Sequence, residues 1–495
     1  MRTRRLVILA GLLAVAVLAA GVAWAGVFTA STPKKVSGAS PFASCTADSG
    51  QTGTNFANTE VEPWVDVNPM DPDNIVATWQ QDRWSDGGSR GLVAGVSKDG
   101  GTSWSEVVIP KLSVCSGNSS YLRASDPWLS FAPNGDLYHI SLSANGGITA
   151  AGFPNSAILV SKSTTGGATW GNPVALKSDS GPNILNDKES VTADPHDSSY
   201  AYAVWDRIDN AGNADPVQVF LHAIASRGPT WFSRTTDGGA SWEPARMIFD
   251  PGEINQTIGN QIVVLPNGDL LDFFDLIFTF KNSNEIRGFN VAFIRSSDKG
   301  ATWSGAKIVD KLNRVTVRDP DTGKAVRTGD FTPDVAVDPA NGNLYIVWQD
   351  GRFSGGTRSD VAFTMSTDGG NSWSPTVKLD QNSAGTSAFL PSVHVAADGT
   401  VGVSYYDFRN NTPDPGLPTD HWFLHCHSGC SDPANWAENH VDGGFDTEKF
   451  PTPGGRFFPG DYLGLTAIGN RFGSLYIKSG STSPSADAWW ATVGP

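Results

Sequence analysis

The sequence predicts an all-β propeller made of four-stranded antiparallel blades, with seven blades favoured over six. Two repeated patterns indicate this fold: an eight-residue turn that ends in Trp and occurs five times, and a short apolar strand that occurs seven times. The 54 Gly and 31 Pro among 495 residues also suit many short strands joined by tight turns.

The repeated turn has the pattern Ser/Thr-x-Asp-x-Gly-x-Ser/Thr-Trp, and we call each copy a staple turn. The copies are SKDGGTSW (97–104), STTGGATW (163–170), TTDGGASW (235–242), SSDKGATW (296–303) and STDGGNSW (366–373). An Asp side chain accepts hydrogen bonds from the backbone ahead of it, Gly permits a positive φ, and Trp returns apolar surface to the core. We therefore expect structural roles for Asp99, Asp237, Asp298, Asp368, Trp104, Trp170, Trp242, Trp303 and Trp373, with Thr165 replacing Asp in the second copy.

The second repeat is a strand that precedes each staple turn. Its copies are PWVDV (63–67), PWLSF (127–131), ESVTA (189–193), NQIVV (260–264), PDVAV (333–337), PSVHV (391–395) and DYLGL (461–465). A turn and a second strand follow each copy, so every unit has four strands and the staple turn joins the third to the fourth. The last unit has three strands of its own, and we expect a strand near residues 53–60 to complete it. A two-sheet sandwich would not explain the five staple turns.

The N-terminus predicts export. Three Arg precede a long apolar run that ends in Ala23-Trp24-Ala25, which is typical of a cleaved signal peptide, although an uncleaved membrane anchor is the alternative. We expect residues 1–25 to be this segment, 26–55 a linker and 56–495 the propeller. We expect a secreted monomer or, if the anchor is not cleaved, a monomer tethered to the outer face of the membrane. A net charge of -15 argues against binding to nucleic acid or to anionic membrane.

Four cysteines in an exported chain favour two disulfides. We expect Cys426 to pair with Cys430, and Cys45 to pair with Cys115. The alternative for the first pair is a zinc site built from His421, His425, Cys426, His427 and Cys430, whose spacing matches no common zinc module. We predict no metal and no cofactor.

Polar residues recur at the ends of the second strands and the starts of the first strands. In a four-stranded meander these positions lie on the face opposite the staple turns, where they would surround the mouth of the propeller. Asp and Arg there suit a carboxylated or polyhydroxylated ligand, because Arg presents paired donors to a carboxylate. The alternative is that they form ion pairs between blades. The residues are Asp82, Arg83, Asp126, Glu189, Arg207, Arg352, Arg409, Asp461 and Tyr462.

The staple turns resemble the Asp boxes, or bacterial neuraminidase repeats, of the sialidase superfamily, over residues 56 to 495. This resemblance implies a sialidase-like β-propeller and an exo-α-sialidase type of glycoside hydrolase acting on a glycan. It implies Tyr462 as nucleophile, Glu189 as its partner and Asp82 as acid/base. Arg207, Arg352 and Arg409 would hold the sugar carboxylate, with Arg83, Asp126 and Asp461 nearby.

Other functions fit the same residues. The arginine motif that sialidases carry in their first blade is absent, since the region reads EVEPWVDV. This favours a non-catalytic cell-surface propeller that binds glycans or proteins. A third possibility is a glycosidase or lyase of another specificity that uses two of the mouth carboxylates.

Overall fold

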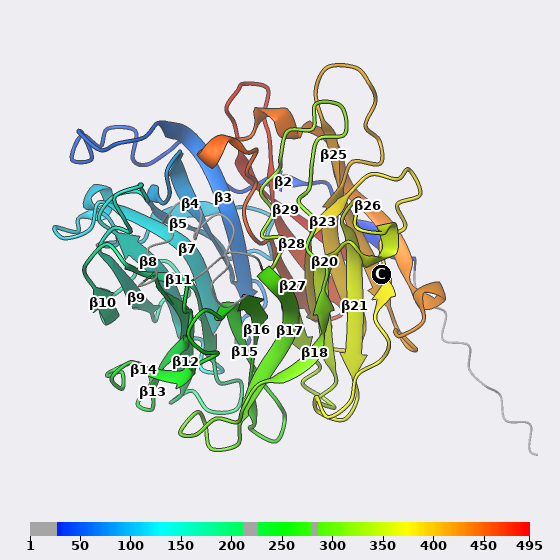
Figure 1. Cartoon of the computed structure of the whole chain (residues 1–495), viewed down its shortest axis with the longest axis horizontal. Coiled ribbons are helices and arrows are strands. Elements are labelled where there is room, and N and C mark those ends of the chain that lie inside the picture. The colour runs from blue at the N-terminus through cyan, green and yellow to red at the C-terminus, as the bar shows by residue number, and fades with distance from the viewer. Residues whose placement is uncertain (1–26, 211–225, 280–285) are drawn as a thin grey trace, which may run out of the picture.

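The computed structural model describes residues 27–210, 226–279 and 286–495, so the predicted export segment, residues 1–25, lies outside the described residues. The described part is all-β apart from five single-turn 3-10 helices. No helix within it is long and apolar enough to cross a membrane. Figure 1 shows the strands standing side by side from β3–β5 to β25–β26.

Within residues 27–210, 226–279 and 286–495, the strands form six hydrogen-bonded sheets, whereas seven blades were predicted. The difference lies in one eight-stranded sheet, which contains two successive four-stranded meanders joined by the single pair of Ser89 with Ala124. These meanders are β3 (Asn55–Val67), β4 (Ile75–Trp84), β5 (Ser89–Ser97) and β6 (Ser105–Val108), then β7 (Arg123–Phe131), β8 (Leu137–Ala144), β9 (Ser156–Ser163) and β10 (Val174–Asp179).

Four further sheets are four-stranded antiparallel meanders, as predicted. They consist of β11 (Ile184–Ala193), β12 (Ala201–Asp209), β13 (Thr230–Thr235) and β14 (Arg246–Phe249); β15 (Gln256–Val264), β16 (Leu270–Thr279), β17 (Ile286–Ser296) and β18 (Lys307–Leu312); β19 (Asp334–Val337), β20 (Leu344–Asp350), β21 (Asp360–Ser366) and β22 (Val377–Lys378); and β23 (Ala388–Val395), β24 (Val401–Asp407), β25 (Pro418–Cys426) and β26 (Ala437–Asp446).

The last sheet combines both ends of the chain. Its strands β27 (Gly464–Ile468), β28 (Arg471–Lys478) and β29 (Asp487–Gly494) are completed by β1 (Thr29–Ala30) and β2 (Lys34–Lys35), which both pair with β29. The expectation that a strand near residues 53–60 completes this sheet is therefore wrong, because residues 55–60 belong to β3 of the first meander. Polar residues of the predicted linker can serve here because an outermost strand needs backbone hydrogen bonds more than apolar side chains.

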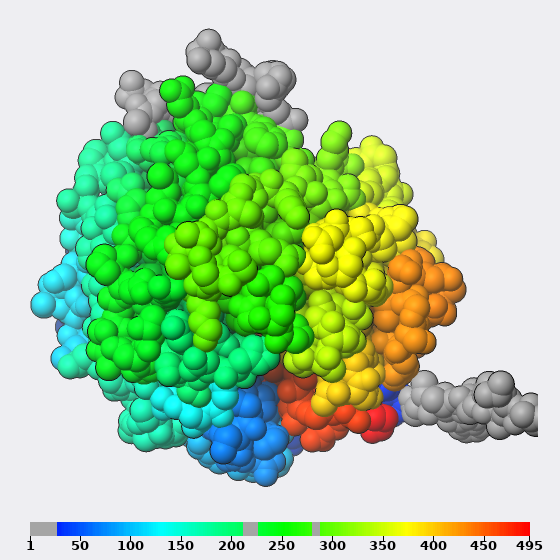
Figure 2. All heavy atoms as spheres, turned by 90° about the horizontal axis from the view of Figure 1, so that it is seen from below, coloured from blue at the N-terminus to red at the C-terminus, as the bar shows by residue number. Residues whose placement is uncertain are grey.

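The sheets form a closed ring. The innermost strand of each meander packs beside that of the next, and β27 packs beside β3. Figure 2 shows the colours running in order around the molecule, with the red C-terminal surface beside the blue N-terminal surface. Buried apolar side chains from adjacent meanders fill the space between them, and one such cluster joins the first meander to the last through Trp79 and Trp490.

The staple turns join the third and fourth strands of five meanders. In the first, Asp99 accepts hydrogen bonds from the Ser103 backbone N–H at 2.9 Å and from Ser103 Oγ at 2.6 Å. These hydrogen bonds, led by that from the Ser103 side chain, lower the pKa of Asp99 to about 2. The same pair of hydrogen bonds recurs at Asp237, Asp298 and Asp368.

Both predicted disulfides are present, Cys45–Cys115 and Cys426–Cys430. The second uses both sulfurs that the zinc alternative required. It lies in the turn between β25 and β26, where the sixth meander has no staple turn. There the Trp436 indole N–H donates to the Cys430 carbonyl at 2.9 Å, as the Trp104 indole does to Gly101 at 3.2 Å in a staple turn. A short disulfide loop thus replaces the Asp-centred turn.

Candidate functional site

Inner strands of the ring carry a β-bulge at equivalent points. The register shifts within β3, β7 and β11 coincide with the left-handed residues Glu62 (φ 55), Asp126 (φ 51) and Lys188 (φ 48). A left-handed conformation of a non-glycine residue costs about 1 kcal/mol or more and commonly marks a functional site. The bulges bring these three side chains together, although they come from three different meanders.

Lys188 lies at the centre of a buried charged layer. Its Nζ lies 2.6 Å from Asp126 Oδ1, 2.8 Å from Asp461 Oδ2 and 3.3 Å from Glu62 Oε1. Asp461 also receives two hydrogen bonds from the Arg327 guanidinium, one of them from Nε at 3.0 Å. We call these five residues the charged layer; it joins the first, second, third and last meanders.

A second arginine lies beside the charged layer. Arg83 donates to Gln80 Oε1 at 2.5 Å, and Gln80 in turn donates to Glu62. The Arg83 and Arg327 guanidinium groups lie over the ring of Phe458, at 5.1 and 4.5 Å from its centroid.

The carboxyl groups of this region differ in the direction in which their pKa values are shifted. Burial alone would raise the pKa of Asp126, but the charge and hydrogen bond of Lys188 outweigh it and lower the pKa. Burial raises the pKa of Glu62 to about 8, helped by the neighbouring Asp126. Burial also raises the pKa of Glu189 well above its usual value, again with a contribution from Asp126. The pKa values of these two carboxyl groups are therefore shifted in opposite directions: Asp126 ionises more readily than usual, and Glu189 holds its proton more firmly than usual.

Tyr462 and Glu189 line one cavity, which inner-strand residues from around the ring surround and which we call the axial cavity. The Tyr462 hydroxyl donates to the Pro127 carbonyl at 2.9 Å. Among the described residues, neither carboxyl oxygen of Glu189 has a hydrogen-bond partner. Trp64 and Trp128 form one wall, stacked with ring centroids 3.3 Å apart. Asp126, Lys188 and Asp461 also line this cavity.

A second cavity adjoins the first and contains three arginines. Arg314, Arg327 and Arg456 line it together with Asp330 and Asp461, and we call it the arginine cavity. Arg314 Nε lies 2.8 Å from Asp330 Oδ1. In the part of the chain that the structure describes, the Arg456 guanidinium has no ion pair, and burial followed by the charge of Arg327 lowers its pKa. The connection before β19 supplies two of these arginines and that before β27 the third.

The structure places the predicted arginines differently. Arg207 makes two hydrogen bonds of 2.8 Å to Asp179 of the preceding meander. Arg352 pairs with Asp310, also of the preceding meander, and with Asp350. Neither lines the axial or the arginine cavity.

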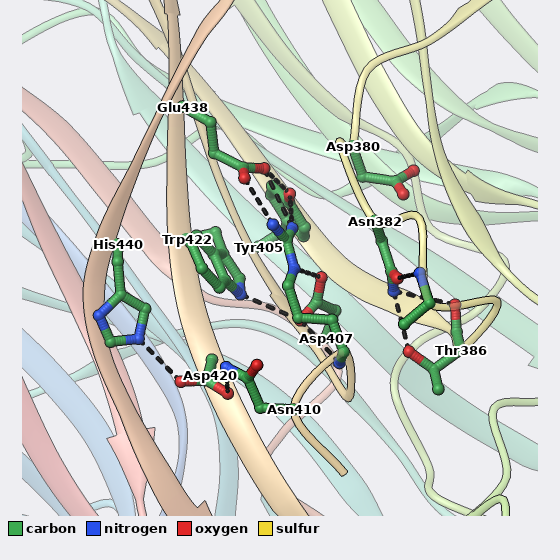
Figure 3. A network of polar contacts seen from close by, with 12 residues as sticks. Asp380, Asn382, Thr386, Tyr405, Asp407, Asn410, Asp420, Trp422, Glu438 and His440 are labelled. Carbon is green, nitrogen blue, oxygen red and sulfur yellow. Dashed lines mark hydrogen bonds and ion pairs between the residues drawn. The ribbon is translucent and has the colours of Figure 1, made fainter.

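Arg409 is held within its own meander. It pairs with Asp407 and Glu438, both at 2.6 Å, donates to the Tyr405 hydroxyl and stacks on Trp422 (Figure 3). Arg207, Arg352 and Arg409 thus do not converge.

Asp82 lies outside both cavities. It is fully buried at a left-handed position and accepts hydrogen bonds from Ser40 Oγ and the Asn58 backbone N–H, both at 2.7 Å. Its carboxylate therefore holds the N-terminal segment against the first meander. The structure does not bring it together with Tyr462 and Glu189.

Sequence reasoning missed Lys188, Arg314, Arg327 and Arg456. A signal for Lys188 was present, because Lys188-Glu189-Ser190 occupies the place in the inner-strand repeat that Glu62-Pro63-Trp64 and Asp126-Pro127-Trp128 occupy. The arginines lie in long connections outside both repeats, where no pattern marks a residue.

The chain matches no protein-family model and no curated protein. Among solved structures, it is similar to the Hadza microbial sialidase Hz136 (17% identity, 85% of this chain and 74% of the other, TM-score 0.46). It is also similar to the Trypanosoma rangeli sialidase in complex with sialic acid (16%, 82% and 59%, 0.46). A third is the Penicillium chrysogenum alpha-L-arabinanase complexed with arabinobiose (16%, 76% and 94%, 0.46). The function proposed below rests on this chain's own residues.

Proposed function

We propose that this protein is an exported glycoside hydrolase with a sialidase-like propeller, in which each of the seven meanders is one blade, and that its substrate is a glycan carrying a carboxylate. The observation that carries the proposal is the pair of Glu189 and Asp126. Both line the axial cavity, and their pKa values are shifted in opposite directions, upward for Glu189 and downward for Asp126.

Two carboxyl groups with opposite protonation states are what glycoside hydrolysis needs. Glu189 would give its proton to the leaving oxygen of the glycosidic bond. Asp126 would act on the other side of the anomeric carbon, either as the nucleophile or as the base that deprotonates a water. General acid catalysis of this kind contributes about 10²–10⁴-fold to a rate. In both cases a water molecule supplies the hydroxyl group of the released sugar, either directly or by hydrolysing the covalent bond between Asp126 and the sugar.

An anionic substrate fits the charges of the arginine cavity. Arg314, Arg327 and Arg456 share this cavity with only two carboxylates, Asp330 and Asp461. Guanidinium groups bind carboxylates through paired hydrogen bonds. Because Asp461 lines both cavities, a sugar bound through its carboxylate would lie close to Asp126 and Glu189.

Exo-α-sialidase is the finer form of this proposal. In that form Tyr462 is the nucleophile, Glu189 takes its proton and Asp82 is the acid/base. Burial raises the pKa of Tyr462 well above its usual value, so the phenol is neutral until a base removes its proton. Attack by Tyr462 also requires it to release the hydrogen bond to Pro127, and Asp82 would have to leave Ser40 and Asn58.

The test is hydrolysis of fluorogenic glycosides by residues 26–495. The panel contains two carboxylated glycosides, an α-sialoside and a β-glucuronide, and three uncharged ones, a β-glucoside, a β-galactoside and an α-L-arabinofuranoside. We expect release from a carboxylated glycoside and a fall in kcat of about 10²-fold or more in Glu189→Gln. Tyr462→Phe separates the two forms, since only a nucleophilic Tyr462 makes this variant inactive. Cleavage of uncharged glycosides alone would refute the carboxylate preference.

The contribution of the arginine cavity to substrate binding can be tested with a matched pair of variants. We expect Arg456→Ala to raise KM for the carboxylated substrate by about tenfold, since a charged hydrogen bond contributes about 1.5 kcal/mol or more. Arg207→Ala, which removes an arginine already bound by Asp179, should leave KM unchanged.

A second candidate is the non-catalytic glycan-binding propeller. The pairing of Arg207 and Arg352 with Asp residues of the preceding meander favours it, because those arginines act between meanders. If no glycoside is cleaved, binding of the same sugars measured by calorimetry would identify this function.

A further inference from the structure

Lys188 differs from the other members of the charged layer in the number of its partners. Its three ammonium hydrogens are directed to Glu62, Asp126 and Asp461, which lie 126, 62 and 273 positions away in the sequence. The side chain is only 7% exposed. A Lys ammonium has three donors and no acceptor, so these three carboxylates use all of its hydrogen-bonding capacity.

The three carboxylates do not depend on Lys188 equally. Asp461 is also bound by Arg327, and Glu62 receives a hydrogen bond from Gln80. Within the described ranges, Glu62 and Asp126 each have Lys188 as their only ion-pair partner, and of these two only Asp126 has a lowered pKa. Removing the ammonium would therefore change Asp126 most.

We propose that Lys188 is a positioning residue of this site: its ammonium group keeps the Asp126 carboxylate ionised and holds it at the wall of the axial cavity beside Glu189. The inference rests on the proposed hydrolase function and deepens it. Lys188 itself transfers no proton and forms no bond to the sugar.

The surrounding charges support this role. The acidic groups that act on Lys188 are Asp126, Asp461, Glu62 and Asp187, from four segments of the ring, and burial alone would lower its pKa. Glu189 and Asp206 lie near enough to interact with it. Arg83 and Arg327 supply the remaining positive charge. Because acids outnumber cations, loss of one cation favours protonation of a carboxyl group.

The backbone supports the same role. Lys188 has φ 48, within the bulge that separates Asp187 from Ser190 in the register of β11. The strained conformation turns a long cationic side chain toward the axis, where a regular strand would place it in a sheet face. The strained backbone at Lys188 thus places a positive charge in the charged layer.

The experiment compares Lys188→Met, which keeps the length of the side chain and removes its charge, with Lys188→Arg, which keeps the charge. In Lys188→Met we expect the acid limb of the kcat–pH profile to move upward by about one to three pH units, the size of the shift that one adjacent charge produces. KM should change less than kcat. Lys188→Arg should keep the acid limb in place. Lys478→Met, which breaks the ion pair with Asp442 elsewhere in the last sheet, is the matched control and should match the native profile.

Chemical rescue provides a second measurement. Lys188→Ala leaves space for a small amine, and ethylammonium should restore part of kcat and return the acid limb toward its native position. An acid limb that stays in place in both Lys188→Met and Lys188→Ala would overturn the proposal.

A third measurement separates the two proposals, because it needs no activity. Without the ammonium, the buried carboxylates are more costly to ionise, so Lys188→Met should lose more melting temperature near pH 8 than near pH 5. If the native protein cleaves no glycoside but this difference appears, the hydrolase proposal fails and the charge-holding role of Lys188 stands. An equal loss at both pH values would overturn that role.

Discussion

Ser372 donates two hydrogen bonds to Asp368, from its backbone N–H at 2.9 Å and from its hydroxyl at 2.6 Å. This pair closes the staple turn between β21 and β22, away from both cavities. We expect Asp368→Ala to lower the melting temperature by a few degrees and to leave activity per folded molecule unchanged. Circular dichroism and the glycoside assay measure the two quantities. A well-folded but inactive Asp368→Ala protein would contradict the structural role.

The second staple turn allows the opposite experiment. Thr165 takes the place of Asp there, and it accepts from the Thr169 backbone N–H at 2.8 Å and contacts the Thr169 hydroxyl at 2.9 Å. A carboxylate would accept both hydrogen bonds more strongly, so Thr165→Asp should raise the melting temperature at neutral pH.

The gain should depend on pH. At the other staple turns hydrogen bonds lower the pKa of Asp, to about 2 at Asp237 and Asp298. A lowered pKa contributes stability above the unfolded pKa and loses it as pH falls through the folded value. The advantage of Thr165→Asp should therefore disappear between about pH 4 and 2. An advantage that is equal at low and neutral pH would have another cause.

Two glycines with the same backbone conformation allow the stability cost of backbone strain to be distinguished from that of a packing clash. Gly101 has φ +87 and Gly268 has φ +86, but a Cβ on Gly101 would lie 2.2 Å from Trp490 Nε1, whereas a Cβ on Gly268 would meet nothing within 4 Å. Both Ala variants carry the left-handed strain of about 1 kcal/mol. We expect Gly101→Ala to lose clearly more stability, since it also displaces Trp490 between the last and first meanders. Equal denaturation midpoints in urea would show that the clash relaxes without cost.

The ionisation of Asp66, at the contact between the first two meanders, should make the stability of the protein depend on pH. It accepts hydrogen bonds from the backbone N–H groups of Phe131 and Val67, both at 2.8 Å, yet burial raises its pKa to about 6. A raised pKa contributes stability below the unfolded value, near 4, that is lost as pH rises through about 6. Asp66→Asn cannot ionise. The melting temperature of Asp66→Asn minus that of the native protein should therefore increase as pH rises from about 4 to 7. A difference that does not change over this range would contradict the raised pKa of Asp66.

The staple turns and inner strands could be predicted because their causes are local. Asp, Gly and Trp at fixed spacing determine a hairpin through contacts within eight residues, and alternating apolar residues determine the strands. The two disulfides were predicted from the number of cysteines together with the expectation of export. Tyr462 and Glu189 were predicted to share a site because strand starts converge at the axis, and they do line one cavity.

The remaining features of the site depend on distant partners. Nothing in the sequence shows which partners Arg207 and Arg327 bind. In the structure, Arg207 pairs with Asp179, whereas Arg327 pairs with Asp461, which lies 134 positions later. Asp82 occupies the expected strand end, but a segment predicted as linker folds back and uses its carboxylate. No repeat encodes such contacts, so only the folded chain shows which charges remain available to a ligand.

The pairing of β1 and β2 with β29 has a consequence for how the protein is made. The strands β1 and β2 are synthesised early but cannot pair in this sheet until β29 (Asp487–Gly494) has been made, because β29 is their hydrogen-bonding partner. In the same way, β3 lacks one of its two neighbours in the ring until β27 has been made. The ring therefore cannot close while the chain is still growing toward these two strands.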